Sequence, residues 1–211
     1  MTIAGTPPVL HLIAGINGAG KTGFYYDHLA SRTPGAEFIN ADEIERDRWP
    51  DAIGAHSHQA AELAARRREE RIAAGTSFVT ETVFSHPSKL DLLDRAQAAG
   101  FTVVLHHIHV STPELAIERV GTRVSAGGHD VPAAAVIARH PRTLALMQQA
   151  PLRADRCYAF DNSRLDHGFT HVATFERGRI RKLGSYVPEW LKATYTTALR
   201  IYLAERRGGP G

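Results

Sequence analysis

The sequence predicts an α/β fold in which a mostly parallel five-stranded sheet carries helices on both faces. Two observations predict it. Short apolar segments alternate with helical segments along most of the 211 residues, as in parallel strands joined by helical crossovers. A glycine-rich motif, GINGAGKT at residues 15–22, lies between the first apolar segment and the first helical one. Because 43% of the residues are hydrophobic, the chain can bury one full core, and we expect a single domain over residues 1–211.

The predicted strands are short, mostly apolar segments, as buried parallel strands are. They are expected, in order, at Val9–Ala14, Glu37–Asn40, Ser77–Glu81, Thr102–Val110 and Cys157–Asp161. Beyond them, a turn across Glu176–Gly178 predicts a hairpin. The C-terminal part of the domain, residues 170–206, therefore combines a hairpin with a last helix.

Proline and glycine mark the ends of the predicted helices. Helices are expected at Lys21–Arg32, Gln59–Ala74, Pro87–Ala99, Thr112 to about Val120, Pro132–Gln149 and Pro188 to about Arg206. Gly75 and Gly100 directly follow two of these helices. Thr112-Pro113-Glu114 supplies a cap, a first-turn proline and an acidic first turn. Pro141 predicts a break in the helix that contains it.

Charge and cysteine content exclude several classes of protein. The formal net charge of +3 suits an anionic ligand without requiring nucleic acid, so a nucleic-acid partner is not expected. The one cysteine, Cys157, excludes an internal disulfide and fits a reducing compartment. No apolar run approaches the roughly 20 residues that span a bilayer, and the N-terminus lacks a signal-peptide pattern. We therefore expect a soluble, cytoplasmic protein with no membrane partner.

The motif at residues 15–22, called the phosphate loop from here on, matches G-x-x-x-x-G-K-[ST] in full. Its glycines let backbone N–H groups turn toward phosphate oxygens, and the helix that follows adds free N–H groups and its positive dipole end. Lys21 is expected to reach the β- and γ-phosphates, and Thr22 to bind Mg²⁺. The sequence thus predicts a P-loop NTPase three-layer sandwich with ATP and Mg²⁺ as cofactors. Nucleotide binding is expected at Gly15, Asn17, Gly18, Ala19, Gly20, Lys21, Thr22 and Gly23.

Missing signatures narrow the class of nucleotide-binding protein. The chain has no Asn-Lys-x-Asp segment, which argues against a GTPase, and no Leu-Ser-Gly-Gly-Gln segment, which argues against an ABC-type ATPase. The third strand ends in Val79-Thr80-Glu81-Thr82 rather than in an apolar run closed by Asp-Glu. A phosphate loop alone does not name the reaction.

Asp42 lies just beyond the carboxyl end of the second predicted strand. Ligands of open α/β sheets bind at that edge, so a carboxylate there can accept the proton of a substrate hydroxyl that faces the γ-phosphate. The alternative is that Asp42 only caps a helix over Ala41–Arg46. The sequence leaves both interpretations open.

Four arginines surround a glycine-containing loop later in the chain. They are Arg119, Arg123, Arg139 and Arg142, with SAGGHDVP at residues 125–132 between the second and the third. Arginines on two helices joined by such a loop predict a small helical lid, about residues 119–142, that closes over the triphosphate and stabilises charge on the transferred group. The alternative is a solvated basic face.

Taken together, these motifs resemble the zeta-toxin family of bacterial kinases, especially its compact members. The matching segments are GINGAGKT, FINADEIER, FVTETVFSHPSK, RVSAGGHDVP, IARHPR and FDNS, which run in order from Gly15 to Ser163. The resemblance implies an ATP-dependent kinase that phosphorylates a hydroxyl of UDP-N-acetylglucosamine or a related UDP-sugar, and a small helical antitoxin as partner. It also implies roles for single residues: Lys21 and Asp42 in catalysis, Arg123 and Arg139 as lid arginines, Arg142 and Asn162 at the nucleotide, and Asn40, Glu81, Thr82 and Ser85 at the acceptor.

Two further clusters have a simpler interpretation. His106, His107 and His109 crowd the fourth strand, but no third and fourth zinc ligand lies at usable spacing. We interpret them as histidines satisfied near the cleft, or with one of them in contact with substrate. The run of charges at residues 66–71 is interpreted as a salt-bridged helix face.

The leading hypothesis is a small-molecule kinase dependent on Mg²⁺ and ATP. Three rivals stay open. The first is a kinase of another small acceptor, such as a nucleoside, an antibiotic or a dinucleotide. The second is a regulatory module that binds ATP without transferring phosphate, and the third is a nucleic-acid kinase.

Overall fold

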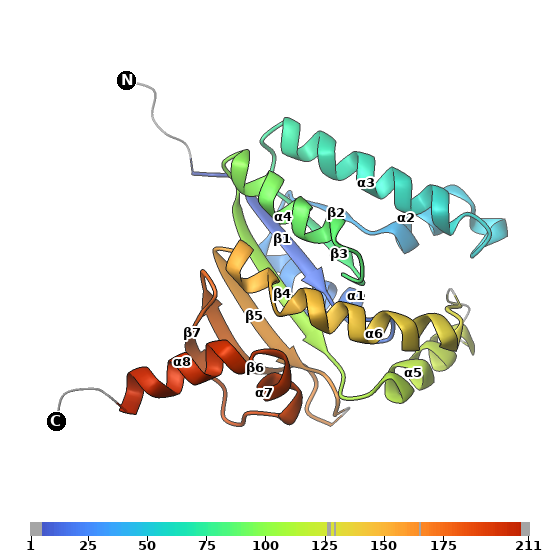
Figure 1. The fold of residues 1–211 in the computed structure, drawn as a ribbon. Coiled ribbons are helices and arrows are strands. Elements are labelled where there is room, and N and C mark those ends of the chain that lie inside the picture. Colours follow the sequence, from blue (N-terminus) through green and yellow to red (C-terminus); the bar gives the residue numbers. More distant parts are fainter. Residues whose placement is uncertain (1–5, 126–127, 129, 165, 208–211) are drawn as a thin grey trace, which may run out of the picture.

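The computed structural model describes residues 6–125, 128, 130–164 and 166–207. Its described residues form a seven-stranded sheet with helices on both faces (Figure 1). The strands are β1 Val9–Ala14, β2 Glu37–Ile39, β3 Phe78–Thr82, β4 Thr102–His109, β5 Arg156–Asp161, β6 Thr170–Glu176 and β7 Arg179–Leu183. The predicted α/β fold with a mostly parallel sheet is confirmed.

The strand order is β2-β3-β1-β4-β5-β6-β7, with the first five of these parallel and the last two antiparallel. The predicted number of five strands is too low, because the C-terminal hairpin joins the same sheet. β6 pairs with β5 from Arg156↔Glu176 to Asp161↔Thr170. This pairing satisfies backbone groups that would otherwise lie unpaired along the edge of β5.

Helices fill the connections, and several differ from the prediction at their ends. They are α1 Lys21–Phe24, α2 Ala41–Arg48, α3 Ser57–Ala73, α4 Ser88–Ala98, α5 Pro113–Ser125, α6 Ala133–Met147, α7 Glu189–Thr194 and α8 Thr196–Arg207. The first predicted helix continues past α1 as a π-helical turn, Tyr25–Leu29, and a 3₁₀ turn, Ala30–Arg32. The last one is divided between α7 and α8 at Tyr195.

The break predicted at Pro141 is absent, because α6 runs without interruption from Ala133 to Met147. A proline inside a helix removes one N–H donor and crowds the preceding turn. The N–H that Pro141 lacks would have bonded to the carbonyl of Ile137. The side chain of Arg142 adds a bond at the next carbonyl, since its Nε donates to Ala138 at 2.9 Å, but it does not replace the lost one.

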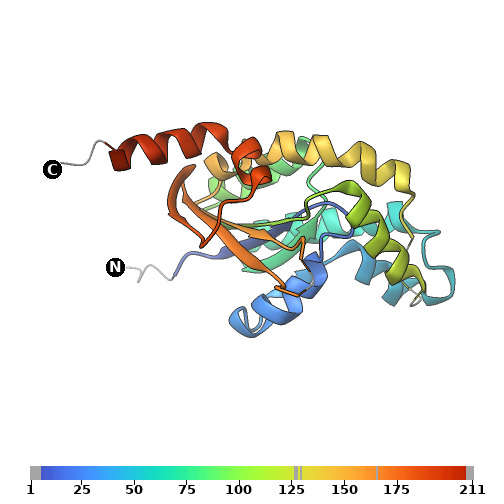
Figure 2. The same ribbon diagram turned by 90° about the horizontal axis from the view of Figure 1, so that it is seen from below.

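The core has one hydrophobic cluster on each face of the sheet. Leu10, Leu12 and Leu105 belong to one cluster, which includes side chains of α3, α4 and α8. Ile13 and Ile108 belong to the other, with side chains of α1 and α5. On the face that bears α1, the described helices leave the sheet uncovered beneath β5, β6 and β7 (Figure 2). No described helix is long and apolar enough to cross a membrane.

Candidate active site

The phosphate loop leaves the end of β1 and enters α1, as its motif requires. Gly18 and Gly20 have φ angles of 79° and 91°, a backbone conformation that residues other than glycine rarely adopt. A Cβ atom at Gly18 would lie 2.2 Å from the carbonyl oxygen of Ala116, and one at Gly20 would lie 2.6 Å from Nδ2 of Asn162. The loop is therefore tightly enclosed and depends on these glycines.

Lys21 and Thr22 begin α1 beside the end of β3. The Nζ atom of Lys21 donates to the carbonyl of Ile16 at 3.2 Å, and Oγ1 of Thr22 donates to Oε2 of Glu81 at 2.8 Å. Burial lowers the pKa of Lys21 and raises the pKa of Glu81, and the opposite charge of each partly offsets the shift of the other. The site thus places an ammonium, a hydroxyl and a carboxylate around one point at the start of α1.

Asp42 lies in the first turn of α2, and Asn40 caps this helix. The Oδ1 atom of Asn40 accepts from the backbone N–H of Asp42 at 2.8 Å. Capping therefore does not occupy the Asp42 carboxylate, and the interpretation of Asp42 as the cap is wrong. Its Oδ2 atom lies 3.8 Å from Nη1 of Arg123. Both side chains line the cavity described below.

The predicted lid arginines come from two helices, α5 for Arg123 and α6 for Arg139. Nη1 of Arg139 donates to Oδ1 of Asn17 in the phosphate loop at 3.0 Å. Arg142 is exposed, its Nε donates to Ala138 of its own helix, and it does not line the cavity beside the phosphate loop, so the structure does not bring it to the other predicted site residues. Residues 126, 127 and 129 of the predicted lid lie outside the described residues.

A cavity of about 900 Å³, called the phosphate-loop cavity, gathers most of the predicted site residues. It is lined by Asn17, Gly18, Gly20, Lys21, Thr22, Gly23, Asn40, Asp42, Glu81, Thr82, Ser85, Arg123, Arg139 and Asn162. Gly15 and Ala19 are buried and do not line it, and a Cβ atom at Gly15 would lie 2.2 Å from the carbonyl oxygen of Ile108. Nδ2 of Asn162 donates to the carbonyl of Ala19 at 2.9 Å, which fixes the end of β5 to the loop.

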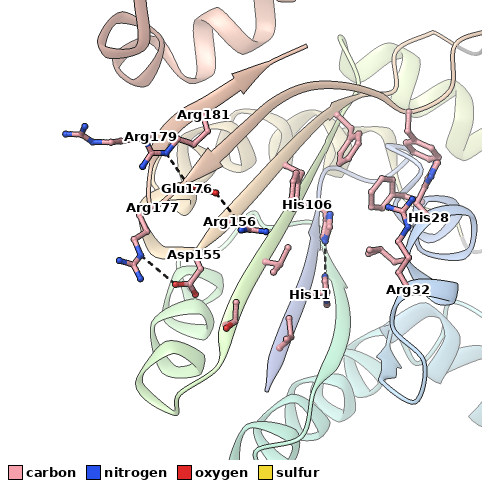
Figure 3. Close-up of a pocket in the computed structure, with 18 residues that line it drawn as sticks. His11, His28, Arg32, His106, Asp155, Arg156, Glu176, Arg177, Arg179 and Arg181 are labelled. Atoms are coloured by element: carbon pink, nitrogen blue, oxygen red, sulfur yellow. Dashed lines mark hydrogen bonds and ion pairs between the residues drawn. The ribbon is translucent and has the colours of Figure 1, made fainter. Parts of the chain in front are cut away.

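A second cavity of about 1340 Å³ lies on the uncovered part of the sheet, away from the phosphate loop (Figure 3). His11 and His106 lie on its floor, with Nδ1 of His11 3.1 Å from Nε2 of His106. Around it, Arg177 pairs with Asp155 and Arg156 with Glu176. Arg181 shares Glu176 with Arg156, and Arg179 pairs with Glu205, so these rim arginines already have carboxylate partners.

The other two histidines of β4 lie on the opposite face and also do not line the phosphate-loop cavity. Nδ1 of His107 lies 2.8 Å from the hydroxyl of Tyr195. The ring of His109 stacks on Trp190 with centroids 4.0 Å apart. Burial lowers the pKa of His109 to about 3, so the ring is neutral and belongs to the packing between β4 and α7.

Sequence reasoning missed two cationic side chains of the phosphate-loop cavity, Arg68 and Lys89. Arg68 is part of the run interpreted as a salt-bridged face, and its neighbours Arg67 and Arg71 do pair with Glu37. Arg68 itself is only 8% exposed. The interpretation is therefore wrong for Arg68, because it is the residue of this run that faces β3.

Comparisons with known proteins agree with this architecture. The model of a family described as AAA domain matches residues 10–145. The solved structure of AvrRxo1-ORF1:-ORF2 with ATP aligns with a TM-score of 0.66 at 17% identity, over 95% of this chain and 64% of that chain. The PezAT toxin–antitoxin system of Streptococcus pneumoniae gives a TM-score of 0.60 at 12% identity, over 98% and 89%. A chain of the Pnkp1/Rnl/Hen1 RNA repair complex aligns with a TM-score of 0.55 at 13% identity, over 70% of this chain and 48% of that chain.

At these identities the solved structures show a shared fold. The chain spans less than two thirds of the AvrRxo1 chain that it matches. No curated protein shows significant sequence similarity to it. The predicted resemblance to a zeta-toxin-like P-loop kinase is confirmed at the level of the fold.

Proposed function

The chain belongs to the AAA domain family, and on that premise we propose that it is a kinase that transfers the γ-phosphate of ATP to a hydroxyl of a small molecule. The observation that carries the proposal is the placement of Asp42. Its carboxylate, which the cap of α2 does not use, shares the phosphate-loop cavity with Lys21 and lies 3.8 Å from Arg123. A base and a cation that meet opposite a phosphate loop suit phosphoryl transfer.

The residues present fit ATP and Mg²⁺. Gly18 and Gly20 let the phosphate loop turn with positive φ while it packs closely against Ala116 and Asn162. The first N–H groups of α1 have no intrahelical partner and are suited to bind phosphate oxygens. Thr22 and Glu81 place two oxygen atoms 2.8 Å apart, the ligand type that Mg²⁺ prefers. When bound, Mg²⁺ neutralises charge that develops on the β- and γ-phosphate oxygens.

In the proposed reaction the acceptor hydroxyl lies between Asp42 and the γ-phosphorus. Its oxygen forms the new P–O bond while the bond from the γ-phosphorus to the β,γ-bridging oxygen breaks, and ADP leaves. The hydroxyl proton passes to the Asp42 carboxylate. Lys21, Arg123 and Arg139 stabilise the charge on the transferred group and on the leaving oxygen.

The acceptor that the family resemblance favours is a UDP-N-acetyl-sugar, with Asn40, Thr82 and Ser85 on the acceptor side of the cavity. A nucleoside, an antibiotic or a dinucleotide would need the same chemistry and a different pocket. An ATP-binding regulatory module is the rival from another class. It predicts ATP binding without a phosphorylated product.

A labelled-phosphate screen tests the proposal. The protein is incubated with Mg²⁺, γ-labelled ATP and either UDP-sugars or a metabolite extract, and labelled products are separated. We expect one labelled small molecule, formed by the wild type and lost in Lys21→Met. Tight ATP binding with no labelled product from any mixture would favour the regulatory module.

A toxin role with a small helical antitoxin is the second part of the proposal. It is supported by the fold shared with the PezAT toxin–antitoxin system. Induced expression in a bacterial host is expected to arrest growth, and Asp42→Asn at equal expression is expected to relieve the arrest. Equal growth of uninduced, wild-type and Asp42→Asn cultures would contradict this role.

A further inference from the structure

Beyond Asp42, the phosphate-loop cavity continues between α3 and the start of α4. Two cationic side chains face this part of the cavity from different helices, Arg68 from α3 and Lys89 from the first turn of α4. The two cavity carboxylates for which the structure shows contacts, Asp42 with Arg123 and Glu81 with Thr22, are engaged at the phosphate end. The acceptor end therefore carries positive charge that these carboxylates do not balance.

Arg68 is buried, and few polar contacts stabilise its positive charge. The side chain is 8% exposed, and its described polar contact is a long one, from Nη1 to Oγ1 of Thr80 at 3.5 Å. The Thr80 hydroxyl is itself committed to the carbonyl of Ile39 at 2.8 Å. No carboxylate of the described residues forms an ion pair with Arg68. Burial lowers the pKa of this guanidinium, so the site disfavours the charge that arginine nevertheless retains.

Lys89 adds a second cation to the same space. It is half-buried, and its backbone N–H donates to the carbonyl of His86 at 3.0 Å. Its side-chain ammonium has neither a hydrogen bond nor an ion pair among the described residues. Burial lowers the pKa of Lys89, and the positive charges of Arg68 and Arg95 lower it further. The charge of Glu69 offsets part of the cost of burial for Arg68, but neither cation forms an ion pair with a carboxylate of the described residues. Two such like charges that face one cavity repel each other and lose hydration. A bound anion would offset the repulsion between the two cations and would replace part of their lost hydration.

We propose that Arg68 and Lys89 form an anion-binding subsite at the acceptor end of the phosphate-loop cavity, so the acceptor is an alcohol that carries a phosphate or carboxylate group. The inference rests on the proposed function, because the subsite is what would direct the acceptor hydroxyl toward Asp42. Guanidinium and ammonium groups recognise both kinds of anion through charge-assisted hydrogen bonds. Neutral nucleosides and cationic antibiotics would leave the two charges unbalanced and are disfavoured as acceptors.

The rival explanation is structural: Arg68 could serve only to join α3 to β3 through Thr80. This explanation gives Lys89 no role and predicts no dependence of ligand binding on its charge. The test therefore needs both residues and a readout of binding as well as of stability.

Calorimetric titration of protein saturated with Mg²⁺ and a non-hydrolysable ATP analogue provides that readout, because the analogue blocks the phosphate loop. The probes are UDP and glycerol 3-phosphate as phosphate ligands, glycerate as a carboxylate ligand, and uridine and glycerol as neutral ones. We expect at least one anionic probe to bind and the neutral probes to bind at least tenfold more weakly. The stronger class of anion identifies the group on the acceptor.

Lys89→Met and Arg68→Met are each expected to raise the dissociation constant of that probe at least tenfold. Arg66→Gln, which removes an arginine of α3 outside the cavity, is expected to leave it unchanged. Arg68→Lys keeps the positive charge and controls for a loss of fold in Arg68→Met. It should retain more binding of the probe than Arg68→Met. Equal affinity of wild type and Lys89→Met, or no anion binding to the analogue-saturated protein, would overturn the subsite.

The outcomes separate the subsite from the kinase. If the anionic probe binds through Arg68 and Lys89 but the labelled-phosphate screen yields no product, the subsite stands and the proposed activity fails. If the screen yields products only from neutral or cationic alcohols, the kinase stands and the subsite is refuted.

Discussion

The carboxylate of Asp42 and the guanidinium of Arg123 lie 3.8 Å apart, although the residues come from α2 and α5. Each side chain is 39% exposed, so the pair is open to solvent and adds little to the stability of the fold. Both side chains line the phosphate-loop cavity, and we propose a catalytic use for the pair. In that proposal a ligand that enters the cavity separates the two charges, so that Asp42 accepts a proton and Arg123 faces a phosphate oxygen.

Gly18→Ala tests the enclosure of the phosphate loop. A Cβ atom there would meet the carbonyl oxygen of Ala116 at 2.2 Å in a backbone conformation with φ of 79°, and the left-handed conformation alone costs about 1–2 kcal/mol. We expect ATP affinity, measured by titration, to fall at least tenfold. Gly121→Ala is the control, because a Cβ atom there meets nothing within 4 Å. Similar ATP affinity of Gly18→Ala and wild type would contradict the enclosed loop.

Arg139→Ala tests the contact between α6 and the phosphate loop. Its guanidinium bonds to Asn17 at 3.0 Å and would face charge that develops during transfer. We expect kcat to fall about 100-fold or more while KM for ATP changes only a few-fold, since a group that acts in the transition state affects kcat most. Arg200→Ala, an exposed arginine of α8, should leave both constants unchanged. A rise in KM with normal kcat would mean that Arg139 only binds substrate.

His106 makes stability depend on pH. Burial, and then the neighbouring His11, lower the pKa of His106 to about 3, whereas an unfolded histidine titrates near 6.5. The unfolded chain therefore binds more protons between these values, and the free energy of unfolding falls as the pH drops through this window. The decrease is up to about 1.4 kcal/mol per pH unit for one such histidine.

Urea unfolding at pH 7, 6 and 5 measures this dependence. The ring of His106 stacks on those of His11 and Tyr158. His106→Phe keeps an aromatic ring there and removes the titrating group, so its free energy of unfolding should fall less steeply on acidification. His58→Gln changes an exposed histidine and should keep the wild-type slope. Equal slopes for wild type and His106→Phe would show that His106 does not remain neutral in the folded protein.

The phosphate loop and the parallel strands were predictable because local patterns determine them. Residues 15–22 need glycine at particular positions, whatever the rest of the chain does. The role of Arg68 was not predictable, because the charges beside it on α3 look alike in sequence and only the packing of α3 on β3 decides which one is buried. The pairing of β6 with β5 also depends on tertiary packing, because the sequence pattern of a hairpin does not indicate which sheet the hairpin joins. Asn40 carried a usable signal: it is a good cap directly before a helix.

Asp42→Asn measured against Glu43→Gln tests the central claim most directly. Glu43 is the adjacent acid of α2, and its carboxylate is bonded to Tyr26 outside the phosphate-loop cavity. The measurement is single-turnover transfer of γ-phosphate to the acceptor found in the labelled-phosphate screen. We predict that Asp42→Asn lowers the transfer rate about 10²- to 10⁴-fold with unchanged ATP affinity, while Glu43→Gln keeps the wild-type rate. A transfer rate for Asp42→Asn within twofold of the wild type would contradict the assignment of Asp42 as the base.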